Sequence, residues 1–290
     1  MIVSLMLHKV AAQSHLPLCT QNLALRLSKL RILGQRGKVR SLRRRRPSIK
    51  TVKGILNKLT PEKYQTLLEQ LVQARITSPD ILQDVVSLVF DKVVLEPTFC
   101  PMYAELCVDL SKALSEFPSS EPGEKPITFR RVLLNTCQCE FEGADALGAE
   151  IRQMTGPDQE LARLEKERNV KLRTLGNIKF IGELFKQKMI PGKLVHTCIQ
   201  ELLGPNPKAI LAEENVEMLC QLLSTVDKEL DSSEKFKSAV DSYFERLRDL
   251  YRSPLLPSPI RFMVRDILDD RANKWVARRE EVRARTINEM

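Results

Sequence analysis

The chain has 290 residues, of which 43% are hydrophobic and 5% aromatic. This length is enough for one large domain or two small ones with a well-buried core. No run approaches the ~18 to 20 apolar residues that a membrane-spanning helix needs, so we expect no transmembrane segment. Leucine is abundant and the alternating pattern typical of strands is scarce, which favours an all-α fold.

The net charge of +9 is concentrated near the N-terminus. Residues 1–61 contain fourteen Lys and Arg and no Asp or Glu, which leaves 32 basic and 37 acidic residues for the rest of the chain. Residues 1–50 are therefore expected to form a basic, disordered arm. Three interpretations stay open for this arm: an organelle transit peptide, a nucleic-acid-binding arm, and an atypical translation start.

The helical spacing of apolar residues begins at about residue 51. Thr60-Pro61-Glu62 and Ser78-Pro79-Asp80 each combine a capping residue, a proline and an acidic residue, which is typical of a helix start. From residue 51 onward, the predicted helices cover residues 52–59, 64–72, 81–90, 99–110, 127–141, 175–190, 194–203, 216–230, 236–251 and 260–271.

Residues 142–173 differ from the segments around them. Gly143, Gly148 and Gly156-Pro157 interrupt the first half, and the second half is highly charged with few leucines. We expect an exposed loop, followed by a solvated lead-in to the helix predicted over 175–190.

The spacing of these helices predicts the architecture. Five antiparallel helix pairs in about 225 residues give roughly 45 residues per pair, the period of HEAT-type repeats. The expected fold is therefore an all-α, HEAT/armadillo-type solenoid over residues 51–276, with a charged tail at 277–290. Such solenoids present long surfaces to partners.

The helix predicted over 175–190 has two apolar faces. Phe180 and Leu184 lie on a different face from the main apolar stripe, and Asn177 lies beside them. Such a helix either packs between two neighbours or turns one face toward another protein.

The last predicted helix also has an aromatic residue off its apolar stripe. The stripe comprises Ile260, Met263, Val264, Ile267 and Leu268, and Phe262 points away from it among Arg265, Asp266 and Asp269. Phe262 either packs beneath the C-terminal tail with Trp275 or forms an aromatic anchor for a partner.

A third candidate site is a mixed-charge stretch. Its basic residues alternate with Glu160, Glu165 and Glu167, and they are Arg163, Lys166, Arg168, Lys171 and Arg173. A solvated helix with internal ion pairs and an RNA contact both fit this pattern.

Residues suited to catalysis are scarce. The histidines are His8, His15 and His196, and His196 lies on an apolar helix where a structural role is expected. There is no Gly-rich phosphate loop, and Cys137-x-Cys139 lacks the second Cys/His pair of a zinc site. The seven cysteines are best explained as free, mostly buried thiols. We expect no enzyme, cofactor or metal.

Several segments resemble, in the right order, the middle domain of eukaryotic translation initiation factor 4 gamma, and the short plant "iso" form most of all. They are residues 51–64, 129–137, 172–189 and 260–271, followed by Asn273-Lys274-Trp275-Val276. Gly176-Asn177-Ile178 and Arg261-Phe262-Met263 are the most specific pieces.

The resemblance implies a cytoplasmic HEAT-repeat scaffold that binds RNA and the DEAD-box RNA helicase of initiation, factor 4 A. It also implies that the scaffold links mRNA to the small ribosomal subunit through initiation factor 3. The positions that it implies for the helicase are Asn177, Phe180, Arg261, Phe262, Asp266 and Asp269. A paralogue that sequesters the helicase in translational repression or mRNA decay is the main alternative, and an RNA-binding protein led by residues 1–50 is another.

Two departures from the family pattern limit what is implied. The family's Trp-bearing segment has no counterpart in residues 1–50, so helicase affinity is expected to be lower. A cap-binding-protein motif would need a helix after Tyr251 and Leu256, and Pro257 opposes it. We expect no cap-binding-protein site.

Overall fold

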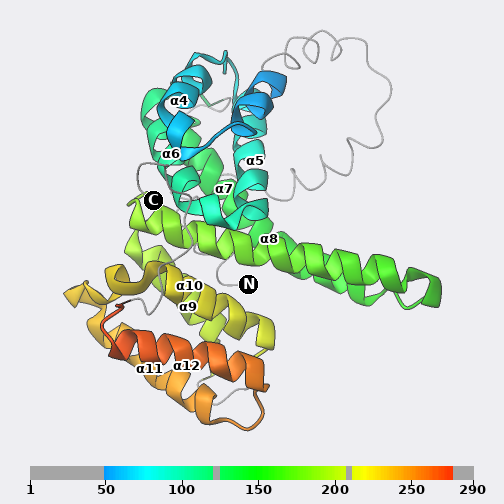
Figure 1. Cartoon of the computed structure of the whole chain (residues 1–290), viewed down its shortest axis with the longest axis vertical. Coiled ribbons are helices and arrows are strands. Elements are labelled where there is room, and N and C mark those ends of the chain that lie inside the picture. The colour runs from blue at the N-terminus through cyan, green and yellow to red at the C-terminus, as the bar shows by residue number, and fades with distance from the viewer. Residues whose placement is uncertain (1–48, 120–124, 207–210, 277–290) are drawn as a thin grey trace. The chain divides into compact units, whose positions relative to one another are not determined.

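The structure is a computed structural model that describes residues 49–119, 125–206 and 211–276 (Figure 1). Its elements are helices, apart from one antiparallel bridge between Phe117 and Ile127. The all-α prediction is therefore confirmed. The arm expected before residue 49 and the tail expected after 276 lie outside the described residues. None of the helices in the described ranges is both long and apolar enough to cross a membrane.

The described residues form two compact units, 49–145 and 146–276. In the first unit, residues 49–56 form a helix, followed by η1 (Pro61–Lys63), α4 (Tyr64–Gln73), α5 (Pro79–Leu95), η2 (Pro97–Phe99), α6 (Cys100–Ala113) and most of α7 (Phe129–Arg152). The second unit contains the end of α7, then η3 (Pro157–Gln159), α8 (Glu160–Lys186), α9 (Gly192–Leu203), α10 (Glu213–Asp231), η4 (Glu234–Phe236), α11 (Lys237–Arg252) and α12 (Ser258–Ala272).

In the first unit, α6 packs against both α4 and α5. The Tyr64 hydroxyl of α4 donates a 2.8 Å hydrogen bond to the Asp109 carboxylate of α6. The predicted start of α5 is confirmed, because the Ser78 side chain accepts a hydrogen bond from the Ile81 amide. At Thr60-Pro61 the chain instead forms a 3₁₀ turn, and α4 begins only at Tyr64.

The expectation of a loop over 142–157 is largely wrong. Helix α7 continues to Arg152, and Gly143 and Gly148 lie inside it. Glycine in a helix costs only about 1 kcal/mol relative to alanine, so two glycines do not end a helix of 24 residues. Gly156 and Pro157 do mark the break before α8. The charged residues that follow are helical and exposed, as a solvated lead-in should be.

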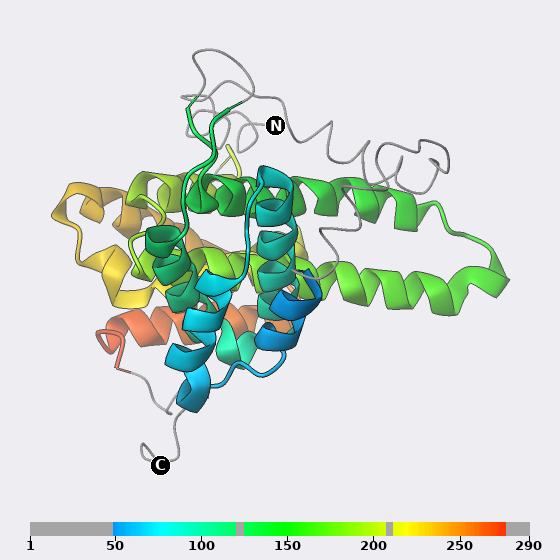
Figure 2. The same ribbon diagram turned by 90° about the horizontal axis from the view of Figure 1, so that it is seen from above.

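The second unit is built around the contact between α8 and α10. Figure 2 shows the length of α8 from above. At the contact between the two helices, Gly182 of α8 faces Thr225 of α10. A Cβ atom on Gly182 would lie 2.7 Å from the Thr225 methyl carbon, closer than real Cβ contacts. Gly182 is therefore required for the close approach of the two helices.

His196 lies within the same unit and is buried, as its apolar helix predicted. Its ring stacks on Phe236 with 4.1 Å between centroids, and its Nδ1 lies 3.4 Å from the Tyr243 hydroxyl. Burial lowers the pKa of His196 below its usual value, which favours the neutral ring. These contacts fasten α9 to η4 and α11.

The C-terminal end of α12 is fixed by the Arg271 cluster, which we define as Asp231, Asp241, Phe244, Arg271 and Trp275. Arg271 donates to both carboxylate oxygens of Asp231 at 2.7–3.2 Å and to Asp241 at 2.7 Å. The Trp275 indole N–H donates to Asp231 at 2.7 Å. One carboxylate thus joins the end of α10 to the end of α12.

Aromatic contacts complete the Arg271 cluster. The Arg271 guanidinium lies 4.1 Å from the Phe244 ring centroid, and Trp275 meets Phe244 edge-on at 6.0 Å. Lys274 and Trp275 have φ of 55° and 60°. These left-handed conformations turn the chain back, so that the indole reaches α11.

Replacing Gly182 with Ala should destabilise the second unit by about 1–3 kcal/mol, because the added methyl group overlaps Thr225. Urea unfolding followed by Trp275 fluorescence would measure the loss, since Trp275 is the only tryptophan and lies in this unit. Gly192→Ala is the matched control. A methyl group there meets its nearest neighbour at 3.6 Å, and the midpoint should not fall. Equal midpoints for both variants would contradict this account.

Replacing Asp231 with Ala should release both Trp275 and Arg271, because each donates to that carboxylate. We expect a red-shifted Trp275 emission and a loss of about 1–3 kcal/mol in unfolding free energy. Asp241→Ala removes a single hydrogen bond to Arg271 and should cost less. An unshifted emission in folded Asp231→Ala would show that the carboxylate does not hold the indole.

Candidate functional site

The candidate site lies on α12, and the packing of this helix determines which of its side chains are exposed. Ile260, Val264 and Ile267 are buried, and α12 contacts α10 and α11 on that side. Met263 and Leu268 are half-buried at the border of the stripe. The predicted apolar stripe is therefore confirmed, and it leaves the opposite side of α12 open to solvent.

Phe262 lies on this open side and is 54% exposed. The Arg265 guanidinium lies 4.9 Å from its ring centroid, one helical turn further along. Trp275 packs against Phe244 and not against Phe262, so the Trp275 part of the alternative is wrong. The C-terminal tail, which forms the rest of that alternative, lies outside the described residues. The ring is available to a partner, and the arginine restrains it.

Charged groups surround the ring. Arg265 and Asp266 form an ion pair of 3.6 Å, and the Arg261 guanidinium donates to the Ser258 hydroxyl at 3.1 Å. We define the α12 surface by its exposed and half-buried residues, which are Arg261, Phe262, Arg265, Asp266 and Asp269. An aromatic ring among charges of both signs is suited to protein binding.

The second predicted aromatic anchor is not on the surface. Phe180 and Asn177 are fully buried in α8, and so is Leu184. Both apolar faces of this helix are covered, so the expectation that Phe180 and Asn177 face a partner is wrong. The structure leaves Arg261, Phe262, Asp266 and Asp269 as the accessible members of the predicted helicase-binding set.

The basic cluster of α8 is helical and largely exposed, but its charges are not equivalent. Arg163 pairs with Glu160 at 3.2 Å and with Glu167 at 2.8 Å. Lys171 pairs with Glu217 of α10 at 2.7 Å. The Lys166 ammonium lies 3.7 Å from the Met154 sulfur.

The other two members differ in exposure, since Arg168 is exposed and Arg173 is half-buried. The internal ion pairs expected for a solvated helix are present at Arg163 and Lys171. Lys166 and Arg168 remain the cations with most freedom to meet a phosphate.

Reactive groups are few in the described residues. Burial raises the pKa values of the Cys137, Cys198 and Cys220 thiols to about 12, so these thiols stay protonated and unreactive near neutral pH. Glu217 and Asp266 add to the shift at Cys220. Within the ranges that the structure describes, no group of three His, Cys, Asp or Glu side chains could hold a metal ion.

Two features of the site were missed at the level of sequence. Arg265 was read only as a neighbour of Phe262, although its three-residue spacing on a helix places it beside the ring. The Arg271 cluster joins residues up to 44 positions apart, so no local pattern signals it.

Comparison with known proteins identifies the family to which the chain is similar. The MIF4G domain model matches residues 49–274. Over 231 residues the chain is 45% identical to eukaryotic translation initiation factor 4G of Arabidopsis thaliana, a match covering 78% of this chain and 13% of that protein. Over 251 residues it is 37% identical to eukaryotic translation initiation factor 4 gamma 1 of Mus musculus, covering 82% of this chain and 15% of that protein.

A solved structure is also similar. It is the crystal structure of the MIF4G domain of Trypanosoma cruzi translation initiation factor EIF4G5, with 21% identity and a TM-score of 0.49, and the match covers 79% of this chain and 97% of that one. The chain spans less than a fifth of the length of the two curated relatives. The family model nevertheless covers most of the chain. The chain therefore belongs to the MIF4G domain family.

Proposed function

We propose that the chain is a non-enzymatic scaffold of translation initiation, and that its α12 surface binds the DEAD-box helicase, initiation factor 4 A. The observation that carries this proposal is the 54% exposure of Phe262 on a helix whose other side is buried. Family membership supports the choice of partner, because the similar proteins from Arabidopsis and mouse are named as initiation factors.

The arrangement of the α12 surface supports a binding role in physical terms. A well-packed stripe and the Arg271 cluster fix α12, so the ring of Phe262 is presented by a rigid element. Arg265 restrains the ring, which lowers the entropy lost when a partner covers it. The neighbouring charges of both signs would set the orientation of the partner.

The proposal extends to RNA and to initiation factor 3 in the cytoplasm. Lys166 and Arg168 supply positive charge on the exposed part of α8, which supports an electrostatic contact with mRNA. Coupling to the small ribosomal subunit through initiation factor 3 rests on the family alone. No residue of this chain is assigned to that contact.

Replacing Phe262 with Ala should weaken binding of the helicase about tenfold or more, because the ring is the main apolar group of the α12 surface. Isothermal titration with purified helicase would measure the change. Tyr251→Ala is the matched control, since Tyr251 is 41% exposed at the end of α11 and outside the α12 surface. Equal affinity of folded Phe262→Ala and wild type would remove the proposed site.

The ATPase rate of the same helicase distinguishes a scaffold from a protein that sequesters the helicase. A scaffold should raise RNA-dependent ATP hydrolysis by the helicase, and Phe262→Ala should reduce that stimulation. If the wild-type chain lowered the hydrolysis rate instead, the alternative function in translational repression or mRNA decay would replace the scaffold.

Replacing Lys166 and Arg168 together with Gln should make RNA binding less dependent on salt. Two lost phosphate contacts lower the slope of log affinity against log salt by about 1.4. Fluorescence anisotropy with a single-stranded RNA, measured over a salt series, gives this slope. Arg163→Gln should change it little, because Glu160 and Glu167 already neutralise that guanidinium. Unequal affinities with equal slopes would contradict a phosphate contact.

A further inference from the structure

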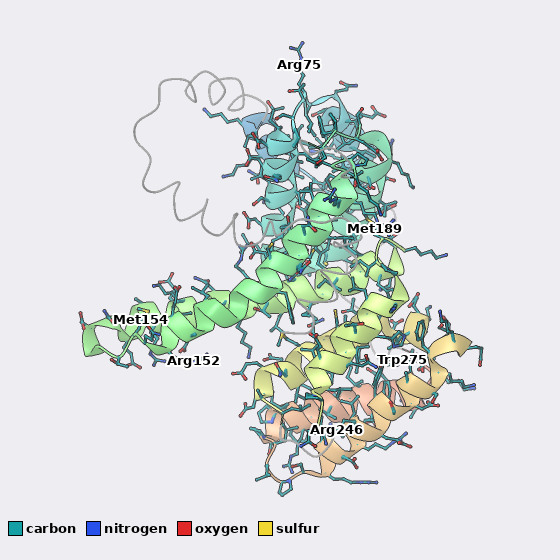
Figure 3. The ribbon with its side chains drawn as sticks, turned by 180° about the vertical axis from the view of Figure 1, so that it is seen from behind. Arg75, Arg152, Met154, Met189, Arg246 and Trp275 are labelled. Carbon is teal, nitrogen blue, oxygen red and sulfur yellow. The ribbon has the colours of Figure 1, made fainter. Side chains whose placement is uncertain are left out.

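The first half of α8, residues 160–173, carries leucines that stay exposed among the described residues. Figure 1 shows this part of α8 extending beyond α9–α12, and Figure 3 places Met154 near its far end. We call residues 160–173 the α8 arm. Leu161, Leu164 and Leu172 are 83%, 48% and 47% exposed. Three exposed leucines on one arm are unusual for a surface helix and need an explanation.

These leucines share a face with two charged residues. At about 100° per residue, Leu161, Leu164, Glu165, Arg168 and Leu172 fall within an arc of about 100°. Other charged side chains of the arm are paired within the chain, as Arg163 and Lys171 show. For Glu165 and Arg168, the described part of the chain supplies no ion-pair or hydrogen-bond partner.

The order of residues on this face is complementary to itself. When two such arms lie antiparallel, with their midpoints between residues 166 and 167, Leu161 of one copy lies opposite Leu172 of the other. In the same register Glu165 lies opposite Arg168 of the second copy. Two-fold symmetry repeats both pairs, which gives four leucines and two ion pairs in one contact.

We propose that the α8 arm is a self-association surface, and that a second copy of this chain occupies it. The charge order selects this occupant, because the acidic and basic residues match only when the arms run antiparallel. A contact of about four helical turns is smaller than a standard protein interface, so the dimer is weak, with dissociation in the micromolar range. The proposal uses no residue of the α12 surface and is independent of helicase binding. It shares Arg168 with the proposed RNA contact, so the association state and RNA affinity are measured separately.

Sedimentation equilibrium of the full chain tests the proposal. Chain concentrations from about 1 to about 200 µM would bracket a micromolar dissociation constant. The wild type should show a monomer–dimer equilibrium. Glu165→Arg and Arg168→Glu each place two like-charged pairs in the contact and should weaken it about tenfold. The double variant carrying both changes should restore dimerisation, because the exchanged charges again face their opposites.

Mixing the two single variants gives the sharpest test. Each should be largely monomeric alone, but the mixture should form a heterodimer, because both ion pairs are then attractive. Leu161→Lys should weaken association without changing the melting temperature, since Leu161 is 83% exposed. Glu245→Arg is the charge control, because Glu245 is exposed on α11 and outside the arm.

Some results would overturn the proposal. They are a wild type that stays monomeric at every concentration, a mixture of single variants that stays monomeric, and a double variant that fails to recover dimerisation. If Arg168→Glu lowered RNA affinity and left the association state unchanged, the arm would be an RNA contact instead.

Discussion

The close approach of α8 and α10 at Gly182 is the contact on which the second unit depends. Because the Thr225 side chain occupies the space that a side chain on residue 182 would need, α10 packs directly against the backbone of α8 at this point. The middle of α8 is buried on its other faces as well, including Asn177 and Phe180. Helix α10, held in this way, becomes the platform against which α9 and α12 pack.

The orientation of α12 follows from that platform. Its apolar stripe seats it on α10 and α11, and Asp231 at the end of α10 holds Arg271 and Trp275 at the other end of α12. A helix fixed along its length and at its C-terminal end can present Phe262 in one orientation. The α12 surface is therefore preformed, which lowers the entropy cost of binding a partner.

Periodicity predicted the helices that have a clear apolar stripe, and it predicted the open side of α12. Periodicity was a less reliable guide where a helix lacks one clear apolar stripe. Residues 142–152 were read as a loop because of Gly143 and Gly148, yet the helical hydrogen bonds of α7 outweigh the modest cost of two glycines. Phe180 was read as outward because it lies off the main stripe, yet a helix covered on two sides has no outward apolar face.

By itself, the sequence determined the family. It also determined the helical content, the start of α5 at Ser78-Pro79 and the solvent side of α12, because each of these depends on neighbours within one or two turns. Only the tertiary structure decided which off-stripe aromatic stays exposed, since that depends on whether a second helix covers it. Phe180 is covered and Phe262 is not. It also decided the partners of Asp231, because residues 40 positions apart meet only after α10 and α12 have packed.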